Sequence, residues 1–296
     1  MISLLWTLIS SCSGEPPCSR SETEQWKLGW RMIENSWGED HNLAAEQFDS
    51  LRQCPDQIEY KFWNMGLSSL KKTQTKDQFQ EVVEGLSPDL KQELYDHGVF
   101  IRELDNLTGF TPAPVTPPTH PELRIELLKM FIDDQNCRGN LMQSVIQKFG
   151  LEDYEPNEGG MVEVDRKNRI RLQEIQEEYG FPTAAMVGKE GMEGVFLVIQ
   201  HAGNDKEWQR SQLPNVKAAF ERGELEGQHY ALLYDRVMLG QGEKQRYGTQ
   251  IIDIDPITKE VVLDSLEDPD NLDQRRMELG MSPIYLYKKI ATGALE

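Results

Sequence analysis

Hydrophobic residues in the first part of the chain recur at intervals of three and four positions. Trp26, Trp30 and Ile33 follow this spacing, and Ala44 and Phe48 follow it again further along. Side chains three or four residues apart lie on one face of an α-helix. The pattern therefore predicts a helical N-terminal domain over residues 25–106.

A proline-rich stretch interrupts this helical pattern. Five prolines fall between positions 111 and 121. Proline has no backbone N–H and a fixed φ, so such a stretch forms neither an α-helix nor a central β-strand. We interpret residues 107–121 as an extended linker between two domains.

The pattern after the linker predicts a second helical domain over residues 122–290. Asp165 is expected to cap a helix that ends before Gly180, and Asn204 or Asp205 is expected to start another. Apolar spacing predicts the other helices of this domain over residues 122–137, 141–149, 191–201, 230–239 and 270–279.

Two short segments near the C-terminus alternate between apolar and polar residues. They cover residues 247–254 and 261–266, with Asp255 and Pro256 between them. A period of two is typical of half-buried strands. The predicted fold class is mainly α: a helical bundle with one small β-hairpin near the C-terminus, preceded by a separate helical N-terminal region.

Composition narrows the classes of partner. The chain has 296 residues, 38% of them hydrophobic, and a formal net charge of −19. This length allows two domains that each bury a core. Because an acidic chain repels phosphate backbones, we expect no nucleic-acid partner.

The N-terminus carries a pattern of its own. An apolar run precedes Ile9-Ser10-Ser11-Cys12, which resembles the lipobox of bacterial lipoproteins with Cys12 as the residue to be lipidated. Residues 1–12 would be the signal and residues 13–24 a polar tether. The resemblance implies a lipid-bilayer partner and anchoring in the bacterial cell envelope. The alternative is an N-terminal extension of a cytoplasmic protein.

Three further cysteines follow, Cys18, Cys54 and Cys137. An envelope location permits a disulfide, and Cys54–Cys137 is the expected pair because Cys18 lies in the tether. The alternative is that all three thiols are unpaired. Their spacing matches no zinc motif.

Polar residues within apolar surroundings define a candidate site. Gln200 and His201 end a strongly apolar run, and His201, Asp205 and Gln209 are spaced four apart. These three share one face if a helix continues through Gly203. His201 is then a structural histidine, a general base oriented by Asp205 with Arg236 in support, or a ligand of a divalent metal together with Asp205 and Asp235.

Asp235 and Arg236 interrupt a second apolar run. A buried charge without a partner costs several kcal/mol, so we expect each of the two to have one, most simply in a salt bridge to another helix. The segment from Gln245 to Gln250 gathers further polar groups around a glycine. It is either a turn held by its own hydrogen bonds or a polar wall around a small ligand. The ligand-binding residues that we expect, in this segment and upstream of it, are Gln200, Gln209, Asp235, Gln245, Tyr247, Thr249 and Gln250.

These motifs resemble an uncharacterised bacterial domain-of-unknown-function family over residues 122–287. The shared features are Asp134 with Arg138, Asp165 with Asn168, Gly180-Phe181-Pro182, Gln200-His201-Ala202, Asp205, Gln209, Asp235-Arg236 and Gln245 to Gln250. The resemblance implies a domain and no particular activity.

The sequence supports three hypotheses about function. The first is an envelope-anchored protein that binds a small polar ligand in a pocket around His201. The second is a hydrolytic enzyme with His201 as general base. The third is a structural or partner-binding module, in which the N-terminal helices bind a protein and the polar residues form an internal brace.

Lipidation can be tested directly. If Cys12 carries the anchor, mass spectrometry of the native protein will find a diacylated or triacylated N-terminus at Cys12, and Cys12→Ala will leave the chain unprocessed. Recovery of native protein from the cytosol with Met1 at its start would contradict the anchor.

Overall fold

The computed structural model describes residues 20–55, 58–114, 116–157 and 159–294. The chain folds as two compact units, Met1–Glu93 and Leu94–Glu296. The proline-rich stretch thus lies inside the second unit, where Thr119 N and His120 N donate to the carbonyl oxygens of Ala185 and Met186. No helix in the described ranges is long and apolar enough to cross a membrane.

The first unit is helical, as its apolar spacing predicts. Its core contains Trp26, Phe48, Phe62 and Leu67. Gly66 allows α3 to pack directly against the ring of Phe48, since a Cβ at this position would lie 2.1 Å from that ring. The helices are α1 (Glu22–Trp37), α2 (His41–Leu51), α3 (Tyr60–Thr73), α4 (Lys76–Glu84) and α5 (Pro88–Asp96), of which α5 crosses into the second unit.

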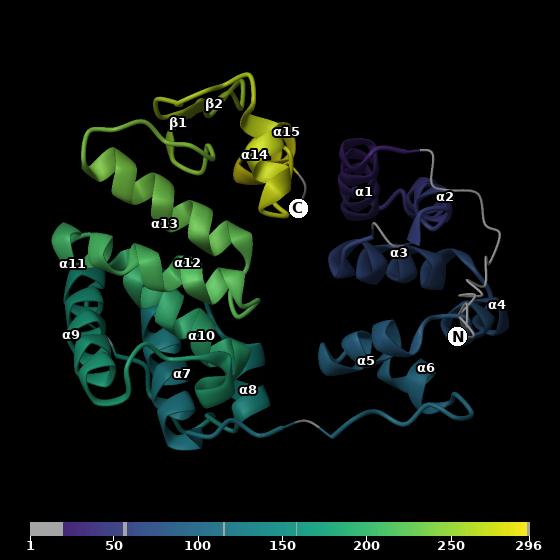
Figure 1. The fold of residues 1–296 in the computed structure, drawn as a ribbon, viewed down its shortest axis with the longest axis horizontal. Coiled ribbons are helices and arrows are strands. Elements are labelled where there is room, and N and C mark those ends of the chain that lie inside the picture. Colours follow the sequence, from purple (N-terminus) through teal and green to yellow (C-terminus); the bar gives the residue numbers. More distant parts are fainter. Residues whose placement is uncertain (1–19, 56–57, 115, 158, 295–296) are drawn as a thin grey trace, which may run out of the picture. The chain divides into compact units, whose positions relative to one another are not determined.

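The second unit is built around α7 and α10, which pack closely against each other (Figure 1). Gly194 makes this possible, because a Cβ there would lie 2.7 Å from the carbonyl oxygen of Leu127. Val195, Ile199 and Leu233 continue the same core. The helices are α6 (Ile101–Asp105), α7 (Pro121–Asn136), α8 (Gln143–Phe149), α9 (Met161–Tyr179), α10 (Ala184–His201), α11 (Lys206–Ser211), α12 (Leu213–Glu221) and α13 (Gly227–Gly240).

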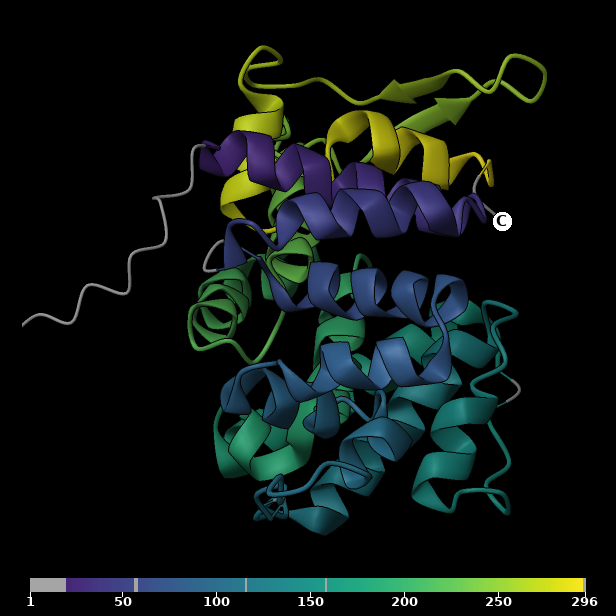
Figure 2. The same ribbon diagram turned by 90° about the vertical axis from the view of Figure 1, so that its right-hand side faces the viewer.

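The predicted C-terminal hairpin is present. β1 (Ile251–Ile254) pairs antiparallel with β2 (Val261–Leu263), with an irregularity in the register between Ile251 and Asp253. Figure 2 shows the two strands and their connecting loop at one end of the second unit. α14 (Leu272–Glu278) and α15 (Ile284–Ala291) complete the chain. The mainly helical fold class with one small hairpin is therefore confirmed.

Several predicted boundaries are wrong. α9 begins at Met161 with Gly160 as its N-cap, so Asp165 lies within the helix and does not cap it. α10 ends at His201 with Ala202 as its C-cap, and Asp205 is the N-cap of α11, as one of the two expected residues. A helix through Gly203 therefore does not exist. The expected strand at 247–254 begins only at Ile251, because the preceding residues form a turn.

The expected Cys54–Cys137 disulfide is also wrong. Cys54 is disulfide-bonded, whereas Cys137 is a free cysteine. The Cys137 thiol donates to the carbonyl oxygen of Asp134 at 3.1 Å, and burial raises its pKa. Cys12 and Cys18 lie outside the described residues.

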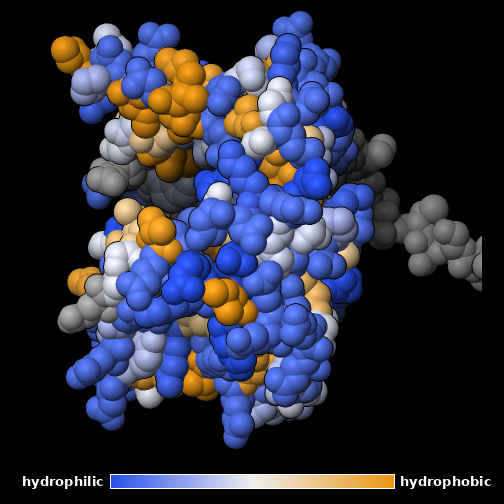
Figure 3. All heavy atoms as spheres, turned by 90° about the vertical axis from the view of Figure 1, so that its left-hand side faces the viewer, coloured by the Kyte–Doolittle hydropathy of each residue, from blue (hydrophilic) through white to orange (hydrophobic). Residues whose placement is uncertain are grey.

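The surface of the second unit is mainly hydrophilic on the face drawn in Figure 3. Hydrophobic side chains gather at the upper left of that view, at the end formed by the β1–β2 hairpin. The hairpin exposes Ile252, Ile257 and Val262.

Gly227 provides a test of close packing. A Cβ at this buried position would lie 2.1 Å from the carbonyl oxygen of Leu279, and a backbone atom cannot rotate away. We expect Gly227→Ala to lower the free energy of unfolding by about 1–3 kcal/mol, as overpacking does. Thermal melts measure this loss. Gly203→Ala, which meets no atom within 4 Å, is the control, and equal melting of the two variants would contradict the close approach.

Candidate functional site

His201 lies at the C-terminal end of α10 with a half-buried side chain. Its Nδ1 is 2.7 Å from Oδ1 of Asp134, a buried residue of α7. A carboxylate accepts hydrogen bonds and donates none, so Nδ1 is the donor and Nε2 is the acceptor nitrogen of the neutral ring. Asp134 therefore fixes both the orientation and the tautomer of His201.

Arg138 links this pair to a second carboxylate. Its Nη2 lies 2.7 Å from Oδ1 of Asp165 on α9, and its Nη1 lies 3.2 Å from Oδ1 of Asp134. Gln135 also donates to Oδ2 of Asp134, at 2.8 Å. We call Asp134, Arg138, Asp165 and His201 the histidine cluster.

Three residues of the histidine cluster are also a candidate binding site for a divalent cation. Asp134, Asp165 and His201 each place one ligand-type atom within 4.8 Å of the others. However, His201 and Arg138 already donate to these carboxylates, so an incoming cation would have to replace two charge-assisted hydrogen bonds. The arrangement favours a fixed imidazole over a metal centre.

Asp205 does not take the expected place beside His201. Its side chain accepts a hydrogen bond from Trp208 N at 3.1 Å and thereby caps α11. Its Oδ2 also lies 3.1 Å from Nη1 of Arg169. Because the chain leaves the helix at Ala202, the carboxylate that orients His201 comes from α7 instead.

Gln209 ties α11 to the last turn of α10. Its Nε2 donates to the carbonyl oxygens of Ile199 and Gln200 at 2.9 and 3.0 Å. The Gln200 side chain is buried, and its Oε1 has no hydrogen-bond partner among the described residues. Both glutamines therefore lie at the end of α10, next to His201.

Arg236, on α13, approaches the same helix end from the other side. Its Nη1 donates to the carbonyl oxygen of Gln200 at 2.8 Å. Within the described part of the chain no carboxylate forms an ion pair with it. Burial lowers the pKa of Arg236, the nearby Arg138 lowers it further, and Tyr287 opposes the shift. Arg236 is thus a largely desolvated cation without an acidic partner.

Asp235 faces a different cluster. Its fully buried carboxylate accepts hydrogen bonds from the backbone N–H groups of Arg246, Tyr247 and Thr249, at 2.7, 3.0 and 3.0 Å. The Thr249 hydroxyl donates to it as well, at 2.9 Å. We call Asp235 and residues 245–250 the aspartate turn. It holds the start of the hairpin against α13.

The rest of the aspartate turn is satisfied internally. Gln245 Nε2 donates to the carbonyl oxygens of Gln250 and Asp264, at 3.0 and 2.8 Å, and its Oε1 accepts from Gln250 N at 2.9 Å. The Tyr287 hydroxyl donates to the carbonyl oxygen of Thr249 at 2.7 Å. These contacts favour the interpretation of this segment as a turn fixed by its own hydrogen bonds.

Arg276 closes the aspartate turn from α14. This buried arginine donates to the carbonyl oxygens of Tyr247 and Ser282, at 2.7 and 2.6 Å, and lies over the ring of Tyr287. Burial lowers the pKa of Arg276 to about 10. Its role was missed in the sequence, where it is one of many charged residues in a helix pattern.

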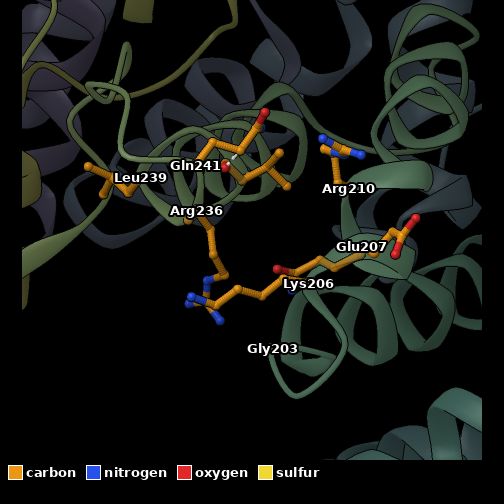
Figure 4. Close-up of a pocket in the computed structure, with 10 residues that line it drawn as sticks. Gly203, Lys206, Glu207, Arg210, Arg236, Leu239 and Gln241 are labelled. Carbon is orange, nitrogen blue, oxygen red and sulfur yellow. Dashed lines mark hydrogen bonds between the residues drawn. The ribbon is translucent and has the colours of Figure 1, made fainter.

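A pocket of about 650 Å³ opens beside Arg236. In Figure 4 Lys206 extends from α11 toward the Arg236 guanidinium, and Arg210 stands on the same helix. No ion pair of these three cations occurs within the described residues. The remaining lining residues are Gly203, Glu207, Gln209, Val237, Leu239, Gly240 and Gln241.

Apart from Asp205, which caps α11, the structure divides the predicted site residues into two groups. Gln200, His201, Gln209 and Arg236 meet at the end of α10. The others, Asp235, Gln245, Tyr247, Thr249 and Gln250, belong to the aspartate turn. The pocket cations Lys206 and Arg210 were missed, because exposed basic residues on a short helix carry no pattern of their own.

Together these features define a mainly helical domain with a histidine cluster and a cationic pocket. A model of a family of unknown function, DUF6624, matches residues 121–295, so the chain belongs to the DUF6624 family. This agrees with the resemblance found over residues 122–287 at the level of the domain. Comparison with curated proteins and with solved structures gives no match.

The two groups should respond differently to truncation. Asp235→Ala leaves four buried donors of the aspartate turn without an acceptor, and we expect it to lower the free energy of unfolding by about 3–5 kcal/mol. His201→Ala leaves Asp134 its bonds from Arg138 and Gln135, and we expect a loss of only about 1 kcal/mol.

Thermal and urea unfolding of both variants beside the parent protein measure these losses. If His201→Ala destabilises the second unit as strongly as Asp235→Ala, then His201 is part of an internal brace.

Proposed function

We propose that the DUF6624 domain of this protein binds a small phosphate-bearing molecule in the pocket between α11 and α13. The observation that carries the proposal is Arg236, a largely buried guanidinium that reaches this pocket without an acidic partner among the described residues. Leaving a buried charge uncompensated costs several kcal/mol, and an anionic ligand would remove that cost.

The charge of the pocket supports a dianion. Its wall carries three cationic side chains, Lys206, Arg210 and Arg236, and one carboxylate, Glu207, which leaves a formal charge of +2. The whole chain carries −19, so this concentration of positive charge is local and runs against the composition. A phosphate monoester carries about −1.5 to −2 charges near neutral pH and therefore matches the wall.

The donor geometry supports the same ligand class. Arginine presents several N–H groups in a planar fork that fits phosphate oxygens, and lysine adds a mobile point charge. One N–H of Arg236 is held by the carbonyl oxygen of Gln200. That bond fixes the direction of the fork before a ligand arrives, which reduces the entropy lost on binding.

The polar pocket that the sequence predicts around His201 would be the pocket between α11 and α13. His201 directly follows Gln200, whose carbonyl oxygen accepts a hydrogen bond from Arg236. Gly203, two residues after His201, lines the pocket. The ligand would therefore bind beside the histidine cluster. The aspartate turn supports α13 from behind and would not contact the ligand.

We also propose that the protein is anchored in the bacterial cell envelope. Cys12 and residues 13–19 of the tether lie outside the described residues, so the support for the anchor is the lipobox-like sequence Ile9-Ser10-Ser11-Cys12. With a lipid anchor at Cys12 the domain would act at a membrane surface. The N-terminal helices would then be available to a protein partner.

Phosphate binding can be measured by calorimetry and by the shift of the melting temperature at constant ionic strength. We expect inorganic phosphate to raise the melting temperature where equal ionic strength of chloride does not. Arg236→Gln should weaken phosphate binding about tenfold or more, since a charge-assisted hydrogen bond contributes about 1.5–3 kcal/mol.

Lys217→Gln is the matched control. It removes the same charge from an exposed residue of α12 whose partner is Glu221, and it should leave phosphate binding unchanged. The absence of phosphate binding to the parent protein, or equal weakening by both substitutions, would refute the proposed function.

A further inference from the structure

We propose that Asp134 and His201 form a general-base dyad that hydrolyses the phosphate ester bound at Arg236. This inference rests on the proposed function, because it needs the ester to occupy the pocket beside α10. It adds a reaction to binding, and it replaces Asp205 by Asp134 as the residue that orients the histidine.

The first support is that the imidazole of His201 is already held in a fixed orientation. Asp134 accepts Nδ1–H at 2.7 Å and is itself held by Gln135 and Arg138. The imidazole is thus locked at one nitrogen, while Nε2 makes no hydrogen bond to the described residues. A general base needs such a free acceptor nitrogen in a fixed direction.

The second support is position. Arg236 donates to the carbonyl oxygen of Gln200, and Gly203 forms part of the pocket wall. His201 lies between these two residues in the chain. Its half-buried side chain retains access to solvent, so a water molecule can reach Nε2. The base and the proposed ligand anchor are therefore held by the same helix end.

The third support is that Arg236 lies close to the histidine cluster. Arg138, which joins the histidine cluster, lies near enough to Arg236 to lower its pKa. Arg138 is already paired with Asp134 and Asp165. Arg236 is therefore the cation that would stabilise the negative oxygens of the phosphoryl group during transfer.

The reaction balances without a further reactant. Nε2 of His201 accepts a proton from water as the water oxygen forms a bond to phosphorus. The phosphorus–oxygen bond to the alcohol breaks, and the departing oxygen takes the proton back from Nε2. The products are the alcohol and inorganic phosphate. Asp134 is a positioning residue and His201 is the catalytic residue.

The test uses the full-length protein and p-nitrophenyl phosphate, with release of p-nitrophenol as the signal. We expect turnover above the buffer rate, and His201→Ala should lower kcat by about 10²–10⁴-fold, the usual contribution of a general base. KM should change less than about threefold, because His201 does not anchor the ester. Added imidazole should restore part of the lost kcat, which a purely structural role would not allow.

Two further variants keep the result interpretable. His201→Gln retains a donor for Asp134 but cannot accept the proton, so it should be as inactive as His201→Ala even if the latter folds poorly. His41→Gln, in the first unit, makes the same change at a histidine that is not part of the histidine cluster and should retain the parent activity.

The outcomes separate this inference from the proposed function. Phosphate binding without turnover would overturn the dyad and leave the binding pocket standing. Turnover that survives His201→Gln would also overturn it. If the parent protein neither binds phosphate nor hydrolyses the ester, both proposals are refuted.

Discussion

The carboxylate of Asp235 is the contact on which the second unit depends. It is fully buried and accepts hydrogen bonds from three backbone N–H groups and one hydroxyl of residues 246–249. Without it these donors would be buried and unsatisfied, and the chain could not reverse into β1. Because Arg236 is the next residue on the same helix, the side of α13 from which it extends is set once Asp235 is seated, and the bond to the carbonyl oxygen of Gln200 then orients its guanidinium. Adjacent helix residues diverge by about 100°, so the pair serves two different clusters.

The distribution of charge separates support from chemistry. In and around the aspartate turn the charged groups have partners: Arg246 pairs with Glu267, and Arg276 donates to the carbonyl oxygens of Tyr247 and Ser282. At the end of α10 the balance is incomplete: Arg236 has only a carbonyl oxygen, and the buried Oε1 of Gln200 has no partner within the described residues. Satisfied polar networks stabilise a fold, whereas unsatisfied ones indicate a place where a ligand can add free energy.

The sequence predicted the helices and the hairpin well because apolar spacing is local information. The expected salt bridges of Asp235 and Arg236 to other helices are wrong: the partners of Asp235 are backbone N–H groups and a hydroxyl of a turn with no periodic pattern, and that of Arg236 is a carbonyl oxygen. The role of Asp205 was misassigned because the helix was extended through Gly203. The true partner of His201, Asp134, stands 67 residues away on α7, and only tertiary packing brings the two together. The family resemblance already included Asp134 and Arg138, but it did not indicate that Asp134 contacts His201.

The β1–β2 hairpin has a consequence for solubility. A two-stranded sheet leaves an open edge on each side, and exposed Ile252, Ile257 and Val262 would allow edge-to-edge association with other copies. Short strands, the register irregularity and neighbouring acidic residues oppose this. Backbone hydrogen bonds from Thr258 and Ile257 lower the pKa of Asp255, so its charge persists to a more acidic pH than that of an ordinary aspartate. The negative charge at the tip of the hairpin therefore opposes association of hairpins over a wider range of pH than an ordinary aspartate would.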